Sequence, residues 1–555
     1  MMRSSADWMG WTIGRALSRA ARLWGGRPFL IDGARRLSFA ETDHEVDRHA
    51  RGLLAAGVGR GDVVAIWLPN CIEWALVWLA CARIGAAAVP INTRYRADEV
   101  EYVLRHSRAA MLVMAARLWT TDYLAILRSF VPEMDDEQRG GALNAARLPA
   151  LRWVLLRGDA ETGAAASLAS LLASGDTLPK GRLEAAARAV VAEDTTIIVY
   201  TSGTSGRPKG ARQAHRILRN GANIGRSRHY EAGDVVLGHM PFYHVAGSVA
   251  TLIPALQFGQ AVVLMHSWAP AEALALIEAE RVNVFGGIPT HFIDLLQTLG
   301  EKRLQRDTIR SAWIGGAAVP PEVARRAVER LGIHSLAAVY GMTETGGATT
   351  YTEWGAPIEL VCANKGKQIG DFELRITDPL RGTPLPPGSD GEIRVRGYLV
   401  MQGYFDDQEA TNAAITPDGW FRTGDLGRLD SDGNLTITGR LKEMFIVGGT
   451  NAYPAEIERF IGQHPAVAQA VVCGVPDARL GEVCFAFVEA RPGATLCADE
   501  IIAFCRARMA DYKVPRFVRI LGELPRTATN KIERHTLQGM ARRIATESGQ
   551  PPPGS

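Results

Sequence analysis

A segment rich in glycine and hydroxyl side chains is the strongest chemical signal in the chain: Tyr200-Thr-Ser-Gly-Thr-Ser-Gly-Arg-Pro-Lys-Gly210. Glycines let the backbone approach a bulky anion, while hydroxyls and amides donate hydrogen bonds to its oxygens. Lys209 adds a point charge suited to a polyphosphate. A Ser/Gly linker would not need the preceding apolar strand or the Pro-Lys-Gly ending. The expected phosphate-binding residues are Thr201, Ser202, Gly203, Thr204, Ser205, Gly206 and Lys209.

This segment is not a Walker P-loop, because the pattern G-x-x-x-x-G-K-S/T is absent, and a P-loop kinase or GTPase is therefore disfavoured. Four later segments contain glycines, and three of them also carry polar side chains: Met240-Pro-Phe-Tyr-His-Val-Ala-Gly247, Gly315-Gly-Ala-Ala-Val-Pro320, Tyr340-Gly-Met-Thr-Glu-Thr345 and Phe421-Arg-Thr-Gly-Asp425. Each has an ordinary explanation when taken alone, such as a structural histidine, a strand-to-helix turn or a solvated glutamate. Their order along the chain is the more specific signal.

Three further segments follow towards the C-terminus: Gly439-Arg-Leu-Lys-Glu443, Ile446-Val-Gly-Gly-Thr-Asn-Ala-Tyr-Pro-Ala-Glu-Ile-Glu458 and Pro525-Arg-Thr-Ala-Thr-Asn-Lys-Ile-Glu-Arg534. Together the segments resemble, in order, the motifs of the acyl-adenylate-forming superfamily, which contains acyl-CoA synthetases, adenylation domains of peptide synthetases and luciferases. The resemblance spans about 200 to 534. It implies an α/β fold with a large N-terminal domain, made of two α/β subdomains plus a distorted β-barrel, and a small mobile α+β C-terminal domain.

The resemblance assigns roles in the large domain. Tyr340 is expected to stack on adenine, Glu344 and Thr201 to bind Mg²⁺, and His244 to line the acyl site. A carboxylate is the hard oxygen ligand that Mg²⁺ prefers while it bridges phosphates. The other nucleotide-site residues implied here are Gly315, Gly316, Gly341, Met342, Thr343 and Thr345.

In the last part of the chain the resemblance assigns Asp425 to the ribose hydroxyls and Arg440 to the ribose or α-phosphate. Lys442 is implied as the pivot between domains, and Lys531 as the catalytic lysine. Gly448 and Gly449 would let the pantetheine arm of coenzyme A pass close to the backbone. The family usually has glycine before this lysine, whereas this chain has Asn530, which tolerates left-handed backbone better than most residues.

The order of predicted elements is consistent with that fold. Predicted strands alternate with helices up to about 350, which favours parallel sheets. Short strands separated by Gly, Pro and Asp turns follow from 366 to 440, and a compact α+β pattern comes after them. A helix over 38–58 is expected to be capped by Thr42. The predicted divisions are an adenylation domain 1–439, a hinge 440–442, a mobile domain 443–540 and a disordered tail 541–555.

Composition sets further bounds on the function. Of the 555 residues, 62 are Lys or Arg and 59 are Asp or Glu, so nothing general points to nucleic acid. Seven cysteines, none in a C-x-x-C pair, argue against a disulfide framework. The longest apolar stretch, 74–91, is interrupted by Arg83, Gly85 and Pro90, so no integral membrane segment is expected. A cytoplasmic protein is predicted, and a homodimer is compatible with the sequence.

The implied reaction joins a carboxylic acid to coenzyme A at the expense of ATP, with Mg²⁺, through an acyl-adenylate. Small residues at 315–317 and 346–348 leave room for a larger apolar acid, which is medium- or long-chain, alicyclic, aromatic or steroid-derived. Three alternatives remain: an acyl-AMP ligase that loads a carrier-protein thiol, a luciferase-like oxygenase, and a non-catalytic nucleotide-binding homologue. The carrier-protein ligase differs from a CoA ligase only in the thiol donor.

Overall fold

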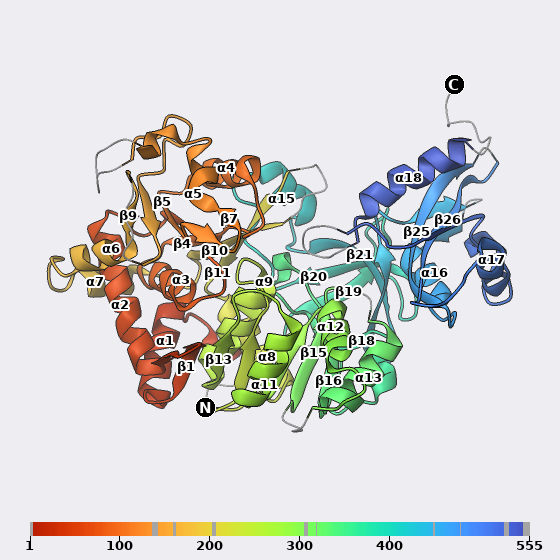
Figure 1. Ribbon diagram of the computed structural model, residues 1–555, viewed down its shortest axis with the longest axis horizontal. Helices are drawn as coiled ribbons and strands as arrows, with labels where there is room; N and C mark the ends of the chain where they lie inside the picture. Colours follow the sequence, from red (N-terminus) through yellow and green to blue (C-terminus); the bar gives the residue numbers. More distant parts are fainter. Residues whose placement is uncertain are drawn as a thin grey trace. The chain divides into compact units, whose positions relative to one another are not determined.

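The computed structural model describes residues 4–135, 143–158, 163–201, 207–304, 309–317, 319–447, 450–477, 479–526 and 532–547. The chain divides into two compact units. Unit 1 comprises Met1–Glu373 and Val395–Phe421, and unit 2 comprises Leu374–Arg394 and Arg422–Ser555. Figure 1 shows both units with their elements labelled. The predicted hinge at 440–442 is not tested by this division and stays a prediction.

One sheet of unit 1 has the strand order β11-β10-β4-β3-β5-β8-β9. All neighbours in it are parallel except β10 and β11, which form an antiparallel pair. Fully buried strands such as β3 are nearly continuous apolar runs, as expected where helices cover both faces. Its strands are β3 (Val63–Trp67), β4 (Ala87–Pro90), β5 (Met111–Met114), β8 (Trp153–Leu156), β9 (Ala166–Ser167), β10 (Thr195–Thr201) and β11 (Lys209–Ala214).

The other sheet of unit 1 runs in the order β18-β17-β16-β15-β14-β12-β13-β1-β2. The strands from β16 to β1 are parallel, whereas β2, β17 and β18 pair antiparallel at the two ends. These strands are β1 (Pro28–Asp32), β2 (Arg35–Ser38), β12 (Val235–Gly238), β13 (Ala261–Leu264), β14 (Val284–Gly287), β15 (Ser311–Gly315), β16 (Ser335–Tyr340), β17 (Thr350–Tyr351) and β18 (Lys365–Gln368).

Helices of unit 1 separate the parallel strands, as the alternation predicted. They include α1 (Ile13–Trp24), α2 (Phe39–Ala55), α3 (Ile72–Ile84), α4 (Ala97–Ser107), α6 (Leu168–Gly175), α8 (Ile217–Ser227), α10 (Ile253–Phe258), α11 (Pro270–Ala279), α12 (Pro289–Leu299) and α13 (Pro321–Leu331). The prediction that Thr42 caps the second helix is wrong. Ser38 is its N-cap and forms a capping box with Glu41, while the Thr42 hydroxyl donates to the Ser38 carbonyl.

The first part of unit 2 contains short strands, within the region 366–440 for which the sequence predicts short strands separated by turns. Their order is β19-β20-β21-β22, and a helix of unit 1, α15 (Gln408–Ala414), lies between β20 and β21 in the chain. The strands are β19 (Glu373–Thr377), β20 (Gly391–Arg396), β21 (Phe421–Leu429) and β22 (Leu435–Arg440). The strands β21 and β22 pair antiparallel, and this pairing places Asp425 opposite Arg440.

The second part of unit 2 is a small sheet with helices on both faces (Figure 1). Alternate residues of β25 (Val467–Asp477) and β26 (Gly481–Ala490) point to opposite faces, as the two-residue period of a strand requires. One face packs on α16 (Pro454–Ile461) and α17 (Ala498–Arg506), and the other packs on α18 (Arg534–Glu547). The remaining strands are β23 (Phe445–Val447), β24 (Thr450–Ala452) and β27 (Phe517–Leu521).

The predicted disordered tail, 541–555, overlaps the last helix. Residues 541–547 form the end of α18, and both Ala541 and Ala545 are buried against the sheet. A short apolar stripe of Leu537, Ala541 and Ala545 at helical spacing explains why this segment orders. The rest of the predicted tail, 548–555, lies outside the described residues. No helix among those that the structure describes is long and apolar enough to cross a membrane.

Candidate active site

The two described ends of the glycine-rich segment lie on an antiparallel pair of strands, β10 and β11. Thr201 at the end of β10 pairs with Lys209 at the start of β11, and the Thr201 hydroxyl donates to the Lys209 carbonyl at 3.4 Å. The predicted site residues Ser202, Gly203, Thr204, Ser205 and Gly206 lie outside the described residues. The hairpin therefore brings the two described members of the predicted phosphate site, a hydroxyl and an ammonium, to one end of the sheet.

Helix α4 anchors the base of this hairpin through two aromatic side chains. Tyr102 donates to the Pro208 carbonyl at 3.0 Å, and His106 Nδ1 lies 2.8 Å from the Tyr200 hydroxyl. Burial raises the pKa of Tyr200, so its phenol stays protonated and can donate to the imidazole. These contacts fix both strand ends that flank the candidate phosphate loop.

The Tyr340–Thr345 motif follows β16, and a short 3-10 helix, η4 (Thr343–Thr345), holds its polar residues. Thr343, Glu344 and Thr345 are buried. The Thr345 hydroxyl lies 3.3 Å from the Met342 amide and 3.0 Å from the Thr349 hydroxyl. Thr345 therefore stabilises the turn itself, a role in addition to the predicted contact with phosphate or carboxylate.

Several contacts join this motif to the hairpin side of the molecule. Gln213 on β11 donates to the Thr343 carbonyl at 2.5 Å, and the Met401 amide donates to the Glu344 carbonyl at 2.8 Å. The structure thus brings β11, which begins with Lys209, next to the turn that carries Glu344. Asn220 of α8 also donates to carbonyls of the segment after η4.

His244 caps the one-turn helix α9 (Val245–Gly247) and is exposed. The Ala246 amide donates to His244 Nδ1 at 3.2 Å, so a neutral ring carries its proton on Nε2 and presents an N–H donor. Such a donor suits an acyl oxygen. A π-helical segment, η3 (Ser248–Leu252), follows directly, and irregular turns of this kind are frequent near functional sites.

Asn70 is a site-supporting residue that the sequence reasoning missed. Its side-chain amide donates to the carbonyls of Gly238 and Met240, both at 2.9 Å, and its oxygen accepts the Phe242 amide at 2.8 Å. Asn70 is buried just after β3, whereas the loop that it holds follows β12 in the other sheet. One sequence feature could have identified Asn70: it is a polar residue at the carboxyl end of a buried strand, where ligand sites form in α/β sheets.

Backbone lies close to two of the glycines in the motifs, Gly315 and Gly341. A Cβ at Gly315 would lie 2.5 Å from the Val339 carbonyl oxygen, and one at Gly341 would lie 2.2 Å from the Gly347 oxygen. Gly316 has φ +75°, which favours glycine. These glycines are required for close packing, so they do not by themselves argue for a wide acyl pocket.

In unit 2, Asp425 is buried, and its carboxylate lies 3.2 Å from Arg440 Nε across β21 and β22. The Asp425 amide donates to the Thr423 hydroxyl at 3.1 Å. Lys442 is exposed after β22. Gly448, Gly449 and Lys531 lie outside the described residues, so their predicted roles stay predictions.

Mg²⁺ matches the donor chemistry of the candidate site. Glu344 offers a buried carboxylate and Thr201 a hydroxyl, which are both hard oxygen ligands. The described part of the chain holds no cluster of three or more His, Cys, Asp or Glu residues that could bind a metal. A metal bound by one carboxylate, with substrate phosphates completing its shell, fits this composition.

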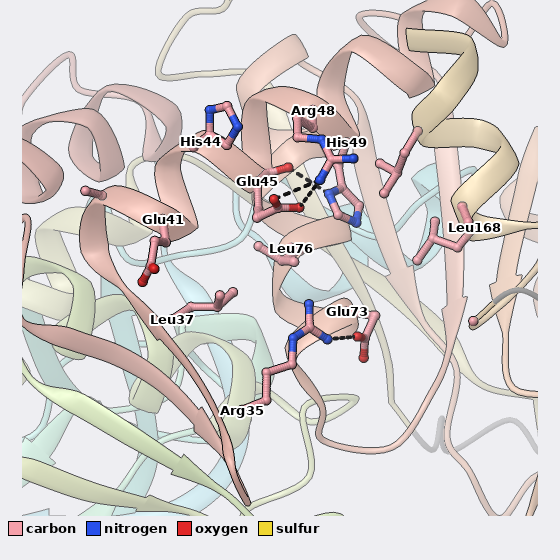
Figure 2. Close-up of a pocket in the computed structure, with 14 residues that line it drawn as sticks. Arg35, Leu37, Glu41, His44, Glu45, Arg48, His49, Glu73, Leu76 and Leu168 are labelled. Atoms are coloured by element: carbon pink, nitrogen blue, oxygen red, sulfur yellow. Dashed lines mark hydrogen bonds and ion pairs between the residues drawn. The ribbon is translucent and has the colours of Figure 1, made fainter. Parts of the chain in front are cut away.

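A pocket of about 630 Å³ lies apart from these motifs, between α2, α3 and α6 (Figure 2). None of the predicted site residues lines it. Its charged side chains already pair with one another: Arg48 with Glu45 at 2.9 Å, and Arg35 with Glu73. Because little uncompensated positive charge remains, this pocket is poorly suited to a nucleotide triphosphate.

The sequence matches the AMP-binding enzyme family over residues 17–405 and the AMP-binding enzyme C-terminal domain over residues 456–531. The chain belongs to the AMP-binding enzyme family. This match and two similar CoA ligases confirm the predicted acyl-adenylate superfamily. They also confirm the predicted enzyme class, an AMP-forming acid–CoA ligase.

Two relatives and one solved structure are similar to this chain over nearly all of its length. A Mycobacterium tuberculosis CoA ligase for a (7a-methyl-1,5-dioxo-octahydro-1H-inden-4-yl)propanoate is 38% identical over 95% of this chain and 98% of its own. The mitochondrial medium-chain acyl-CoA ligase ACSF2 of Danio rerio is 34% identical, over 92% and 84%. ATP-bound MatB from Rhodopseudomonas palustris has a TM-score of 0.82 and 28% identity, over 96% and 100%. This similarity confirms the predicted α/β fold with large and small domains.

Proposed function

We propose that this protein is an ATP-dependent carboxylic acid–CoA ligase that converts an acid, ATP and CoA into acyl-CoA, AMP and diphosphate. The observation that carries the proposal is the near end-to-end similarity to CoA ligases, which covers 92–95% of the chain. The proposal is supported by the position of two candidate site residues: Thr201 ends β10 and Glu344 follows β16, and ligands bind at the carboxyl ends of strands in such sheets.

In the first half-reaction a carboxylate oxygen of the acid attacks the α-phosphorus of ATP, and the bond to diphosphate breaks. Transfers of this kind need mainly positioning and charge neutralisation. Lys209 and the Thr201 hydroxyl are suited to hold the phosphates, and Tyr340 to support adenine. Mg²⁺, bound through Glu344 and Thr201, would supply positive charge to the phosphate oxygens. Lys531 is assigned by the family motif to the reacting oxygens.

In the second half-reaction the CoA sulfur attacks the acyl carbonyl carbon of the adenylate, and the bond to AMP breaks. The thiol loses its proton to solvent, and the AMP phosphate leaves with the bonding electron pair. His244 Nε2–H is suited to donate to the acyl oxygen, since Nδ1 is occupied by the Ala246 amide. A rotation about Lys442 would exchange Lys531 for the CoA-binding surface between the two steps.

The acid is proposed to be a medium- or long-chain or bulky apolar one. This part rests on the relatives, of which one is a medium-chain ligase and another acts on a propanoate with a fused two-ring substituent. Cytoplasmic location and a homodimer stay predictions, and one relative is a mitochondrial enzyme.

The test is AMP release from ATP by the full chain with a panel of acids and free CoA. The panel should contain acetate, octanoate, palmitate, benzoate and a fused-ring alicyclic propanoate. We expect CoA-dependent AMP release with at least one apolar acid and little with acetate. Adenylate formation with transfer only to a carrier-protein thiol would establish the alternative ligase. Absence of ATP–diphosphate exchange with every acid would overturn the proposal.

A further inference from the structure

Tyr404 lies in a backbone segment that pairs with β11 along the edge of the hairpin. The Arg212 amide donates to the Gly403 carbonyl at 3.0 Å, and the Phe405 amide donates to the Gly210 carbonyl at 2.7 Å. Tyr404 itself forms an antiparallel bridge with Ala211. This pairing places the Tyr404 side chain beside the start of β11, although about 195 residues of sequence separate the two.

The Tyr404 side chain contacts two candidate site residues at once. Its hydroxyl donates to Glu344 Oε1 at 3.0 Å, and Lys209 Nζ lies 5.3 Å from the centre of its ring. An ammonium within about 6 Å of an aromatic ring is attracted to the ring's negative face. A tyrosine phenol ordinarily titrates at about pH 10, so the hydroxyl is a hydrogen-bond donor at neutral pH.

Tyr404 contacts two side chains of opposite charge, the Glu344 carboxylate and the Lys209 ammonium. A carboxylate and an ammonium in one site attract each other, and a direct ion pair would neutralise the two charges that a metal and a phosphate each require. Tyr404 holds the carboxylate by its hydroxyl and the ammonium by its ring, and it carries no charge of its own. Each of the two charged groups therefore has a neutral partner in Tyr404.

We propose that Tyr404 is a positioning residue that holds the Glu344 carboxylate for Mg²⁺ and the Lys209 ammonium for the triphosphate of ATP. The inference rests on the proposed function and assigns this residue a role within it. The backbone around Tyr404 is fixed independently of the phenol, since its amide donates to the Thr411 hydroxyl at 2.9 Å. Removing the hydroxyl should therefore leave the fold intact.

Two substitutions separate the two contacts. Tyr404→Phe keeps the ring below Lys209 and removes only the hydrogen bond to Glu344. Tyr404→Leu removes both. Tyr398→Phe is the matched control, because the Tyr398 hydroxyl also donates to a carboxylate, that of Asp371 at 2.9 Å, and Asp371 has no predicted role in the site.

The experiment measures Mn²⁺ binding by electron paramagnetic resonance, with the full chain saturated with a non-hydrolysable ATP analogue, and analogue binding by calorimetry without metal. Loss of a hydrogen bond to a charged group should weaken Mn²⁺ binding about tenfold in Tyr404→Phe, with metal-free affinity for the analogue unchanged. Tyr404→Leu should weaken both, and Tyr398→Phe should match the wild type. Thermal unfolding of each variant reports whether the fold is kept.

Wild-type Mn²⁺ affinity in a folded Tyr404→Phe variant, or an equal loss in Tyr398→Phe, would overturn the positioning role and leave the proposed function standing. Failure of the wild-type protein to bind the analogue or to exchange diphosphate into ATP would instead overturn the proposed function, and the role of Tyr404 with it.

Discussion

Asp425 and Arg440 face each other on neighbouring antiparallel strands, with Asp425 Oδ1 3.2 Å from Arg440 Nε. The sequence assigned both residues to the same nucleotide, one to the ribose hydroxyls and the other to the ribose or α-phosphate. The carboxylate is buried, whereas the guanidinium is largely exposed. The ion pair with Arg440 therefore helps to hold the Asp425 carboxylate in place.

Asp425→Asn should weaken ATP binding about tenfold without unfolding the protein. The amide keeps the size of the carboxylate but loses its charge and part of its capacity to accept hydrogen bonds, which corresponds to about 1.4 kcal/mol. Calorimetric Kd values for ATP check this. Asp432→Asn, in the exposed turn after β21, is the control and should bind ATP normally. An unchanged Kd in Asp425→Asn would contradict the ribose assignment.

Lys531→Ala should slow adenylation about 10²-fold or more, by analogy with the removal of one transition-state donor. ATP–diphosphate exchange with a substrate acid measures this step alone. Lys302→Ala removes an exposed lysine of unit 1 and should exchange at the wild-type rate. Near-normal exchange in Lys531→Ala would refute the catalytic assignment.

Lys442→Pro should retain adenylation and lose thioester formation. Proline fixes φ near −65°, which would block the backbone rotation predicted at this position. Lys442→Ala keeps that freedom and should support both half-reactions. Diphosphate exchange and acyl-CoA formation are measured side by side for each variant. Equal loss of both half-reactions in Lys442→Pro, with normal folding, would argue against a hinge here.

His215 should make the protein less stable as the pH falls. It is fully buried, its Nδ1 accepts the Ile13 amide at 3.1 Å, and burial lowers the pKa of His215 to about 4. The unfolded state, with a pKa near 6.5, binds a proton first, so stability rises with pH between about 4 and 6.5 and is lost as pH falls through that range. The largest contribution of this group is about 3 kcal/mol.

His215→Asn keeps an acceptor near the Ile13 amide but does not titrate in this range. Plots of Tm against pH between 4 and 6.5 should therefore be flatter for this variant than for the wild type. His44→Gln alters an exposed histidine and should leave the wild-type slope unchanged. The same slope in His215→Asn as in the wild type would contradict the role of this residue.

Much of the fold follows from local patterns. The predicted alternation of strands with helices up to about 350 is confirmed, for example at β8, β13 and β15, where short apolar runs form strands of a covered sheet. Two predictions were wrong at the ends of helices, where neighbouring residues are alternative candidates for the cap or the boundary. Ser38 rather than Thr42 caps α2, and the stripe through Leu537 and Ala545 was too short to distinguish from a polar tail.

Contiguous motifs in the sequence were enough to indicate the family, the order of the motifs and the chemical types of the candidate site residues. Only the tertiary structure revealed Asn70 beside the loop of His244 and Tyr404 between Glu344 and Lys209. It also showed that Gly315 and Gly341 are small because backbone lies against them. Most of these contacts join residues far apart in the chain, because the order of the strands in a sheet brings them together. No periodic pattern or fixed spacing in the sequence predicts them.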